Sequence, residues 1–352
     1  MNEQEQEHIR HTFLSGGAAP RAESQTAVSL AATQKNPKLT PIHNECFYNH
    51  GDNLVESLTS LLNGLSDPTE INWQDSIGLS ALHLLCGFNG SAHFIKALEL
   101  LLESKANYKA MDLRGYTPFH YMCFNAMIPT EVQQQGFTLL LRYGADINAK
   151  EYRVRASPLH LLCNYNTTKK LDSILSLFVL HRASLHARTI ENRTALHCLC
   201  RTHHDEHLLG AITILVRHGA DANVRDEKNL TALHEVCLFY QRSDLGSVID
   251  QLLSAKATCI NYGAMHKRTA LHLIAIHYHG DNLPELIDSM IGRHGIISFF
   301  FLFILYCFSL NHRCVCSLQV PIQIKVTRNI EHLSIISCNT AVPAAGLKSS
   351  KC

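Results

Sequence analysis

The chain has 352 residues, of which 46% are hydrophobic and 17% are charged, so it carries enough apolar side chains to exclude wholesale disorder. This length fits about two average domains or one extended array of repeats. Lysine and arginine number 31 against 30 for aspartate and glutamate, and the formal net charge of +1 argues against a general affinity for nucleic acid or anionic membranes.

Residues 1–37 form the first segment, which is rich in Gln, Glu, Ser, Ala and Thr and has no helical or strand periodicity. We therefore expect a disordered polar N-terminal arm. The first 35 residues contain no apolar stretch of the kind that a secretory signal needs, and the 13 cysteines of the chain are an odd number. Reduced thiols fit these features best, so we expect a cytoplasmic protein, with the nucleus as an alternative.

A seven-residue string begins at residue 40 and recurs along the chain. Its seven copies read TPIHNEC (40–46), SALHLLC (80–86), TPFHYMC (117–123), SPLHLLC (157–163), TALHCLC (194–200), TALHEVC (231–237) and TALHLIA (269–275). The histidines of successive copies are 37 to 40 residues apart. A period of this length predicts a repeat architecture, in which each unit buries its apolar face by stacking on its neighbours.

Each position of the string has a physical role at the start of a helix. The hydroxyl residue three before the histidine predicts an N-cap, and the proline or alanine that follows it suits the first helical position. The next residue is Ile, Leu or Phe, and a cysteine follows four residues later in six copies, so both fall on one buried face. We interpret the histidine as a partner of neighbouring backbone and the cysteine as a small buried hydrophobe.

A second amphipathic helix is expected later in each unit, where the clearest copies read LLLESKAN (100–107), LLLRYGADIN (139–148) and ILVRHGADAN (214–223). A turn is then expected five residues before the next histidine. Gly78, Gly115, Asn192 and Asn229 occupy that position in four copies and accept a positive φ, whereas Lys38, Arg155 and Lys267 give a weaker turn signal.

The lengths of the units differ in a defined place. The turn that ends the second helix is assigned to Pro68, Lys105, Gly144, Arg182, Gly219 and Lys256. From this position to the next histidine there are 15 or 16 residues, whereas 22 to 25 residues separate it from the histidine before it. We therefore expect the variation to lie between the two helices of a unit, where a surface loop grows at small entropic cost.

These strings, in this order, resemble the ankyrin repeat, over about residues 38–295. The resemblance implies an all-α solenoid of seven stacked helix-turn-helix units with short β-hairpin-like fingers. The units depart from the family in being 37 to 40 residues long instead of about 33, and in having larger residues where the family usually has alanines. We expect the extra length to extend some helices by about one turn.

The resemblance also implies that the finger turns and the concave groove bind other proteins. Ten basic residues stand in the turn segments against five acidic ones, so we expect an acidic or phosphorylated protein partner. The candidate partner-binding residues are Arg114, Arg153, Arg155, Arg188, Arg193, Arg225, Lys228 and Arg268.

Four aromatic residues stand five positions after a histidine, namely Tyr48, Phe88, Tyr165 and Phe239. An aromatic side chain exposed in the groove is a candidate binding anchor. The alternative is that these rings pack under the loops between the helices, and we favour this second interpretation.

Catalysis and metal binding have little support in the sequence. No phosphate-binding, dinucleotide-binding or nucleophile-elbow motif occurs, so we expect no catalytic residues and no cofactor. Successive histidine and cysteine copies lie a repeat apart and do not converge on one metal ion. The cluster at 203–207 lacks the order of the metalloprotease motif, so we expect no metal site.

The pattern breaks after Gly295, where residues 296–310 read IISFFFLFILYCFSL without a charge. As a helix this run spans about 22 Å, against about 30 Å of bilayer hydrocarbon. Residues 296–352 are therefore an atypical tail with three interpretations. The run anchors the chain in a membrane with Arg293 and Arg313 at the interfaces, it covers the last repeat, or it is an alternative ending with no evolved role.

The function that fits these features is a non-catalytic protein-interaction scaffold or adaptor, expected to be a monomer that does not bind nucleic acid. One alternative is a membrane-tethered ankyrin protein anchored by residues 296–310, with its repeats in the cytosol. Another is a substrate adaptor of a ubiquitin ligase, which occurs within the family. That role requires an appended recruitment box, and none can be read after Gly295.

Overall fold

The structure of the chain is a computed structural model that describes residues 39–166, 170–254, 263, 269–283, 285–287 and 290. The expected arm at 1–37, the tail at 296–352 with its apolar run and the candidate residue Arg268 lie outside these residues. All described residues belong to one compact unit, Met1–Ser309.

A helix begins at each of the seven repeated strings. These first helices are α3 (Pro41–Tyr48), α5 (Ala81–Phe88), α7 (Pro118–Phe124), α9 (Pro158–Tyr165), α11 (Ala195–Thr202), α13 (Ala232–Phe239) and α15 (Ala270–His277). The hydroxyl residue before each helix has extended backbone dihedrals and forms the N-cap, as expected from its short polar side chain. The predicted helix starts are therefore confirmed.

In the described part of the chain, a second helix with defined bounds follows in six units. These helices are α4 (Leu54–Asn63), α6 (Phe94–Glu103), α8 (Thr130–Tyr143), α10 (Leu171–Leu180), α12 (Leu208–Arg217) and α14 (Leu245–Leu253). Each buries one stripe of residues spaced by three or four, as Leu98, Leu101 and Leu102 do in α6. A short 3-10 helix, η1 (Pro68–Asn72), lies between α4 and α5.

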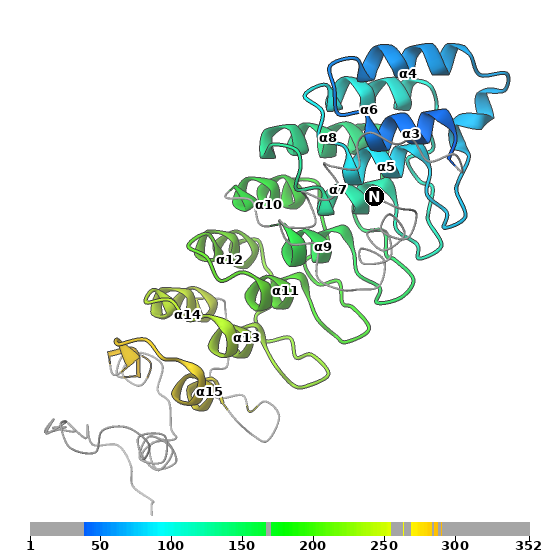
Figure 1. Ribbon diagram of the computed structural model, residues 1–352. Helices are drawn as coiled ribbons and strands as arrows, with labels where there is room; N and C mark the ends of the chain where they lie inside the picture. Colours follow the sequence, from blue (N-terminus) through cyan, green and yellow to red (C-terminus); the bar gives the residue numbers. More distant parts are fainter. Residues whose placement is uncertain are drawn as a thin grey trace, which may run out of the picture. The chain divides into compact units, whose positions relative to one another are not determined.

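The helices stack in two layers (Figure 1). One layer contains the first helices and the other contains the second helices, and each helix contacts its counterpart in the next unit. The long turns that connect one unit to the next project beside the layer of first helices. The described residues contain no β-strand, and their only bridge joins Gln74 to Ser80 at the base of one turn. The predicted all-α solenoid is confirmed.

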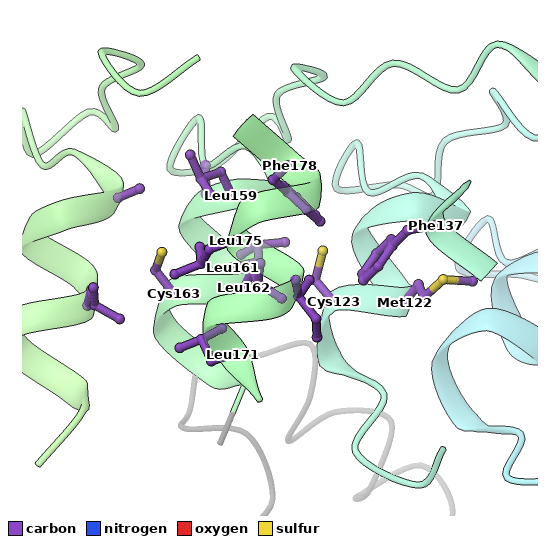
Figure 2. Close-up of a cluster of buried hydrophobic side chains, with 14 of the residues drawn as sticks. Met122, Cys123, Phe137, Leu159, Leu161, Leu162, Cys163, Leu171, Leu175 and Phe178 are labelled. Carbon is purple, nitrogen blue, oxygen red and sulfur yellow. The ribbon is translucent and has the colours of Figure 1, made fainter. Parts of the chain in front are cut away.

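The core runs continuously between the two layers, and Figure 2 shows the part around α7, α9 and α10. Met122, Cys123, Phe137, Leu162 and Phe178 are each 0 to 1% exposed there. The repeated cysteines behave as the sequence suggested. Cys46, Cys86, Cys123, Cys163, Cys200 and Cys237 are all buried, and burial raises the pKa of each thiol well above its ordinary value.

The prediction that the length variation lies between the two helices is wrong. In each of the six complete pairs five residues separate the first helix from the second. The extra residues lie instead in segment 64–80, which contains η1, and in α8, which has 14 residues where α4, α6, α10 and α12 have ten. The assignment of Pro68 to the turn caused the error, because Pro68 begins η1 and its ring excludes a positive φ.

Buried amides connect the ends of successive first helices, a feature that the sequence analysis missed. Asn89 caps α5 and donates from Nδ2 to the carbonyl oxygens of Cys46 and Asn49, each at 2.9 Å. Asn125 caps α7 and donates in the same way to Cys86 at 3.0 Å and to Asn89 at 2.9 Å. Because free carbonyls at a helix end need partners, this asparagine ladder fixes the stacking of the units.

Candidate functional site: the finger turns

The candidate site is formed by the turns that lead from one unit to the next, because these turns carry exposed basic and apolar side chains. We define the finger turns as residues 73–79, 110–116, 149–156, 187–193 and 224–230. The repeated histidines hold them in place. Nε2 lies 3.1 to 3.2 Å from a finger carbonyl oxygen of the next unit in the pairs His43–Leu79, His83–Tyr116, His120–Ala149, His160–Arg193 and His197–Leu230.

The hydrogen bonds of these histidines fix their tautomer. In α7 the backbone N–H of Thr117 donates to Nδ1 of His120 at 3.1 Å, so the ring proton is on Nε2 and is donated to Ala149. The same capping arrangement occurs at α5, α9, α11, α13 and α15. His83, His120, His160 and His197 therefore each cap their own helix and bind the next finger at the same time.

Burial has a clear effect on these rings. It lowers the pKa of His83, His120 and His160 from 6.5 to about 4 and also lowers that of His197, so the rings are neutral at pH 7. The structural interpretation of the repeated histidines is therefore confirmed. Within the part of the chain that the structure describes, no group of three or more His, Cys, Asp and Glu side chains is placed to hold a metal ion.

An acidic side chain closes four of the five finger turns from inside. Asp112 accepts hydrogen bonds from the backbone N–H of Arg114 at 2.9 Å and of Tyr116 at 2.8 Å. Glu151 accepts three backbone bonds in the same way, from Arg153, Val154 and Ala156. Asp75 and Asp226 close their own turns. These four carboxylates are 1 to 8% exposed, so they do not face a partner.

The backbone of the turns explains the glycine and asparagine column. Gly78, Gly115, Asn192 and Asn229 have φ of 57° to 85°, which confirms the predicted turns. Arg155, where the sequence signal was weaker, adopts the same conformation with φ of 58°. Gly78 also allows a close approach, because a Cβ atom there would lie 2.8 Å from the backbone nitrogen of Leu113. The first two fingers therefore pack backbone against backbone.

Hydrogen bonds between backbones join the tips of consecutive fingers. Leu113 donates to Ile77 at 3.1 Å, Tyr152 to Arg114 at 2.7 Å, Ile190 to Val154 at 2.9 Å and Glu227 to Glu191 at 3.0 Å. This tip ladder crosses all five finger turns. It holds the tips at fixed positions relative to one another without the use of any side chain.

The structure places seven of the eight candidate binding residues on the finger turns. Arg153, Arg155, Arg188, Arg225 and Lys228 are exposed, and Arg114 is half-buried. Arg193 differs, because its side chain is only 17% exposed and lies 2.7 Å from Glu191 and 3.5 Å from Asp226. The candidates therefore form one basic surface across fingers two to five, with Arg193 held inside it.

Sequence reasoning missed the apolar residues of this surface. Leu113, Tyr152 and Ile190 are 72%, 65% and 53% exposed, and they occupy the same position at the tips of three consecutive fingers. Each directly follows the residue that closes its turn, Asp112, Glu151 or Thr189. An alignment of the repeats shows an apolar residue directly after the turn-closing residue in three consecutive units. The prediction considered only the charged residues of the turns and therefore did not include these positions.

Four aromatic residues each stand five residues after a repeated histidine, and they do not form a common surface. Tyr48 and Phe88 are buried and Tyr165 is half-buried. Their rings pack against aromatic neighbours on the first helices, as Phe88 does on Phe47 at 5.2 Å, and not under the loops between the helices as we expected. Phe239 is the exception, because it is 41% exposed and lies under the Arg201 guanidinium at 5.5 Å.

Comparison with known proteins relates this fold to the ankyrin repeat. A search of curated proteins finds no match. The ankyrin repeat model matches residues 191–227, which include α11 and α12. The crystal structure of the human ASB11 ankyrin repeat domain matches with 18% identity and a TM-score of 0.53, covering 71% of this chain and 96% of that one. Residues 191–227 therefore match an ankyrin repeat, and the chain has the fold of ankyrin repeat domains.

A second solved ankyrin repeat domain has the same fold. It is that of Bcl-3, described as a unique member of the IkappaB protein family, and it matches with 19% identity and a TM-score of 0.53 over 72% of this chain and all of that one. Ankyrin repeats are generally protein-protein interaction modules, and the fold is typically a non-enzymatic scaffold. Among the described helices of this chain, none combines the length and hydrophobicity that a membrane span requires. The apolar run at 296–310 lies outside them.

Proposed function

We propose that this protein is a non-catalytic scaffold or adaptor that binds an acidic or phosphorylated segment of a protein partner on its finger turns. The observation that carries the proposal is the unequal burial of charge. Three of the five acidic residues counted in the turns, Asp112, Glu151 and Asp226, are 1 to 5% exposed and bonded inside the turns. Of the eight basic turn residues that the structure describes, five are exposed, so the surface offered to a partner is more basic than the ratio of ten to five in the sequence.

The contributions of the candidate residues are expected to differ. Arg153 and Arg188 are exposed, so their guanidinium groups can approach an anionic group of a partner. Arg193 is held by Glu191 and Asp226, so we expect it to support its turn more than to contact the partner. Arg268 lies outside the described residues and stays a prediction.

Affinity capture from cells tests the proposal. Arg153→Glu with Arg188→Glu reverses two exposed charges on neighbouring fingers, and we expect it to reduce partner recovery at least tenfold. The matched control is Arg142→Glu with Arg217→Glu, which makes the same change at exposed positions near the ends of α8 and α12. Equal recovery with both double variants, at unchanged helical content by circular dichroism, would reject the finger assignment.

We propose a cytoplasmic location and a monomeric state, in line with the reduced thiols expected from the sequence. The competing role, a membrane tether at residues 296–310, is tested by alkaline extraction of membranes. Release of all the protein into the soluble fraction supports the proposal, and retention in the pellet that is lost on deletion of residues 296–352 would replace it with the tether.

A further inference from the structure

We infer that the fingertip row, defined as Leu113, Tyr152 and Ile190, docks an extended acidic segment that carries an apolar side chain at every third residue. The inference rests on the proposed function and adds to it the chemistry and the spacing of the partner. It assigns the main binding contacts to the apolar tips and a supporting role to the surrounding arginines.

The distribution of exposed apolar residues is the first observation. Eight large apolar side chains are exposed in the described residues, and five of them lie in the finger turns: Trp73, Met111, Leu113, Tyr152 and Ile190. Single exposed apolar residues are ordinary on a protein surface. Equivalent positions on three consecutive turns are not, because turns at the surface usually carry polar side chains that water solvates.

The row has defined ends. The equivalent tip residue is Ser76 in the first finger and Glu227 in the fifth. The apolar surface therefore covers the second, third and fourth fingers, and a partner segment of about nine extended residues would cover it.

The tips are ordered before any partner arrives. Their backbones are joined by the tip ladder, and the ring of Tyr152 lies directly over Gly115, where a Cβ atom would be 2.8 Å from Cγ of the ring. The hydroxyl of Tyr152 also lies 3.0 Å from Sδ of Met111. Because little backbone freedom of the turns remains to be lost, apolar contacts on this row are converted efficiently into affinity.

Charge complementarity selects the partner. Arg114 and Arg153 directly follow the tips Leu113 and Tyr152, and the exposed Arg188 lies two residues before Ile190. The carboxylates of Asp112 and Glu151 in the same turns are buried and bonded to backbone amides. An apolar segment with acidic residues between its anchors fits this surface, and a segment with basic residues is repelled by it.

The repeat spacing sets the spacing of the partner. Packed helices lie about 8 to 10 Å apart, and each finger follows the first helix of its unit. An extended chain rises about 3.3 Å per residue, so successive fingers correspond to about three residues of partner. The expected segment therefore has apolar residues at positions i, i+3 and i+6, with aspartate or glutamate between them.

Selection from a phage-displayed library of random 12-residue peptides on the full-length chain tests this inference. We expect the selected peptides to be acidic and to have apolar residues at intervals of three. Fluorescence anisotropy with a labelled selected peptide then gives affinities. Each of Leu113→Ser, Tyr152→Ser and Ile190→Ser should raise its Kd about tenfold or more, whereas Leu180→Ser, a change at an equally exposed leucine of α10, should leave it unchanged.

Several results would overturn the inference. They are selection of neutral or basic peptides, selection of no peptide, equal binding to the triple tip variant, and apolar residues at another interval. Self-association of the wild-type chain that the triple variant abolishes, measured by analytical ultracentrifugation, would assign the row to a second copy of the chain. If the tip variants capture the cellular partner normally and the charge-reversal variant does not, the row fails while the proposed function stands.

Discussion

Glu235 occupies a position on α13 at which α5, α9 and α15 have a leucine, one residue after the repeated histidine. Its side chain is fully buried, and neither carboxylate oxygen accepts a hydrogen bond from the described residues. The nearest cation is the Arg201 guanidinium at 3.7 Å, and burial raises the pKa of the Glu235 carboxyl. The free energy lost when this carboxylate is removed from water exceeds the free energy gained from its attraction to one cation at this distance.

Replacement of Glu235 by leucine is therefore expected to stabilise the array. We expect Glu235→Leu to raise the free energy of unfolding by about 1 to 2 kcal/mol, measured by urea denaturation at pH 7. The companion variant Arg201→Met leaves the carboxylate without its cation and should lower the free energy of unfolding. A loss of stability in Glu235→Leu would show that the pair contributes more than the geometry indicates.

The asparagine ladder operates at the scale of the helix. Asn125 is 2% exposed, and its side-chain amide donates hydrogen bonds to the carbonyl oxygens of both Cys86 and Asn89. Gln133 of α8 extends the ladder, because its Nε2 donates to Met122 at 2.9 Å and its Oε1 accepts from Asn166 at 3.1 Å. A substitution here affects three successive units.

Asn125→Ala is expected to lower the free energy of unfolding by about 1 to 3 kcal/mol, because it leaves two buried carbonyl oxygens without that donor. Chemical denaturation followed by circular dichroism measures the change. The control is Asn63→Ala, at an exposed position at the end of α4, which should change stability by less than about 0.5 kcal/mol. Equal effects of the two variants would contradict the role assigned to the ladder.

The limits of sequence prediction are clearest in these elements. The starts of the first helices could be predicted, because the hydroxyl cap, the following proline or alanine and the histidine all act within one turn of helix. The position of the extra residues could not be predicted. The number of residues between His43 and Pro68 is the same wherever in that segment the insertion lies. The burial of Asp112 and Glu151 and the exposure of Leu113 depend on contacts between units, which local patterns do not specify.

The repeated histidines couple the stability of the whole array to pH. In the unfolded chain they take up protons near pH 6.5, whereas His83, His120 and His160 in the folded array do so only near pH 4. The unfolded state therefore binds more protons between these values. Stability is fully present above pH 6.5 and is lost as the pH falls toward 4.

We expect the urea midpoint to be constant above about pH 7 and to fall from there to pH 5, with a loss on the order of 2 kcal/mol at pH 5 for each of these three histidines. The raised pKa of Glu235 acts in the opposite direction, because the folded state then binds the extra proton. His120→Asn should be less stable at pH 7 and show a shallower dependence on pH. An unchanged midpoint over this range would show that the folded rings take up protons at the same pH as the rings of the unfolded chain.

The tip ladder has an evolutionary consequence. Its hydrogen bonds use only main-chain atoms, from the Ile77 carbonyl in the first finger to the Glu227 amide in the fifth. Side chains at the tips are therefore free to diverge without disturbing the scaffold beneath them. A duplicated copy of this gene could acquire a new ligand through a handful of codon changes at positions such as 113, 152 and 190, while the rest of the chain keeps its architecture.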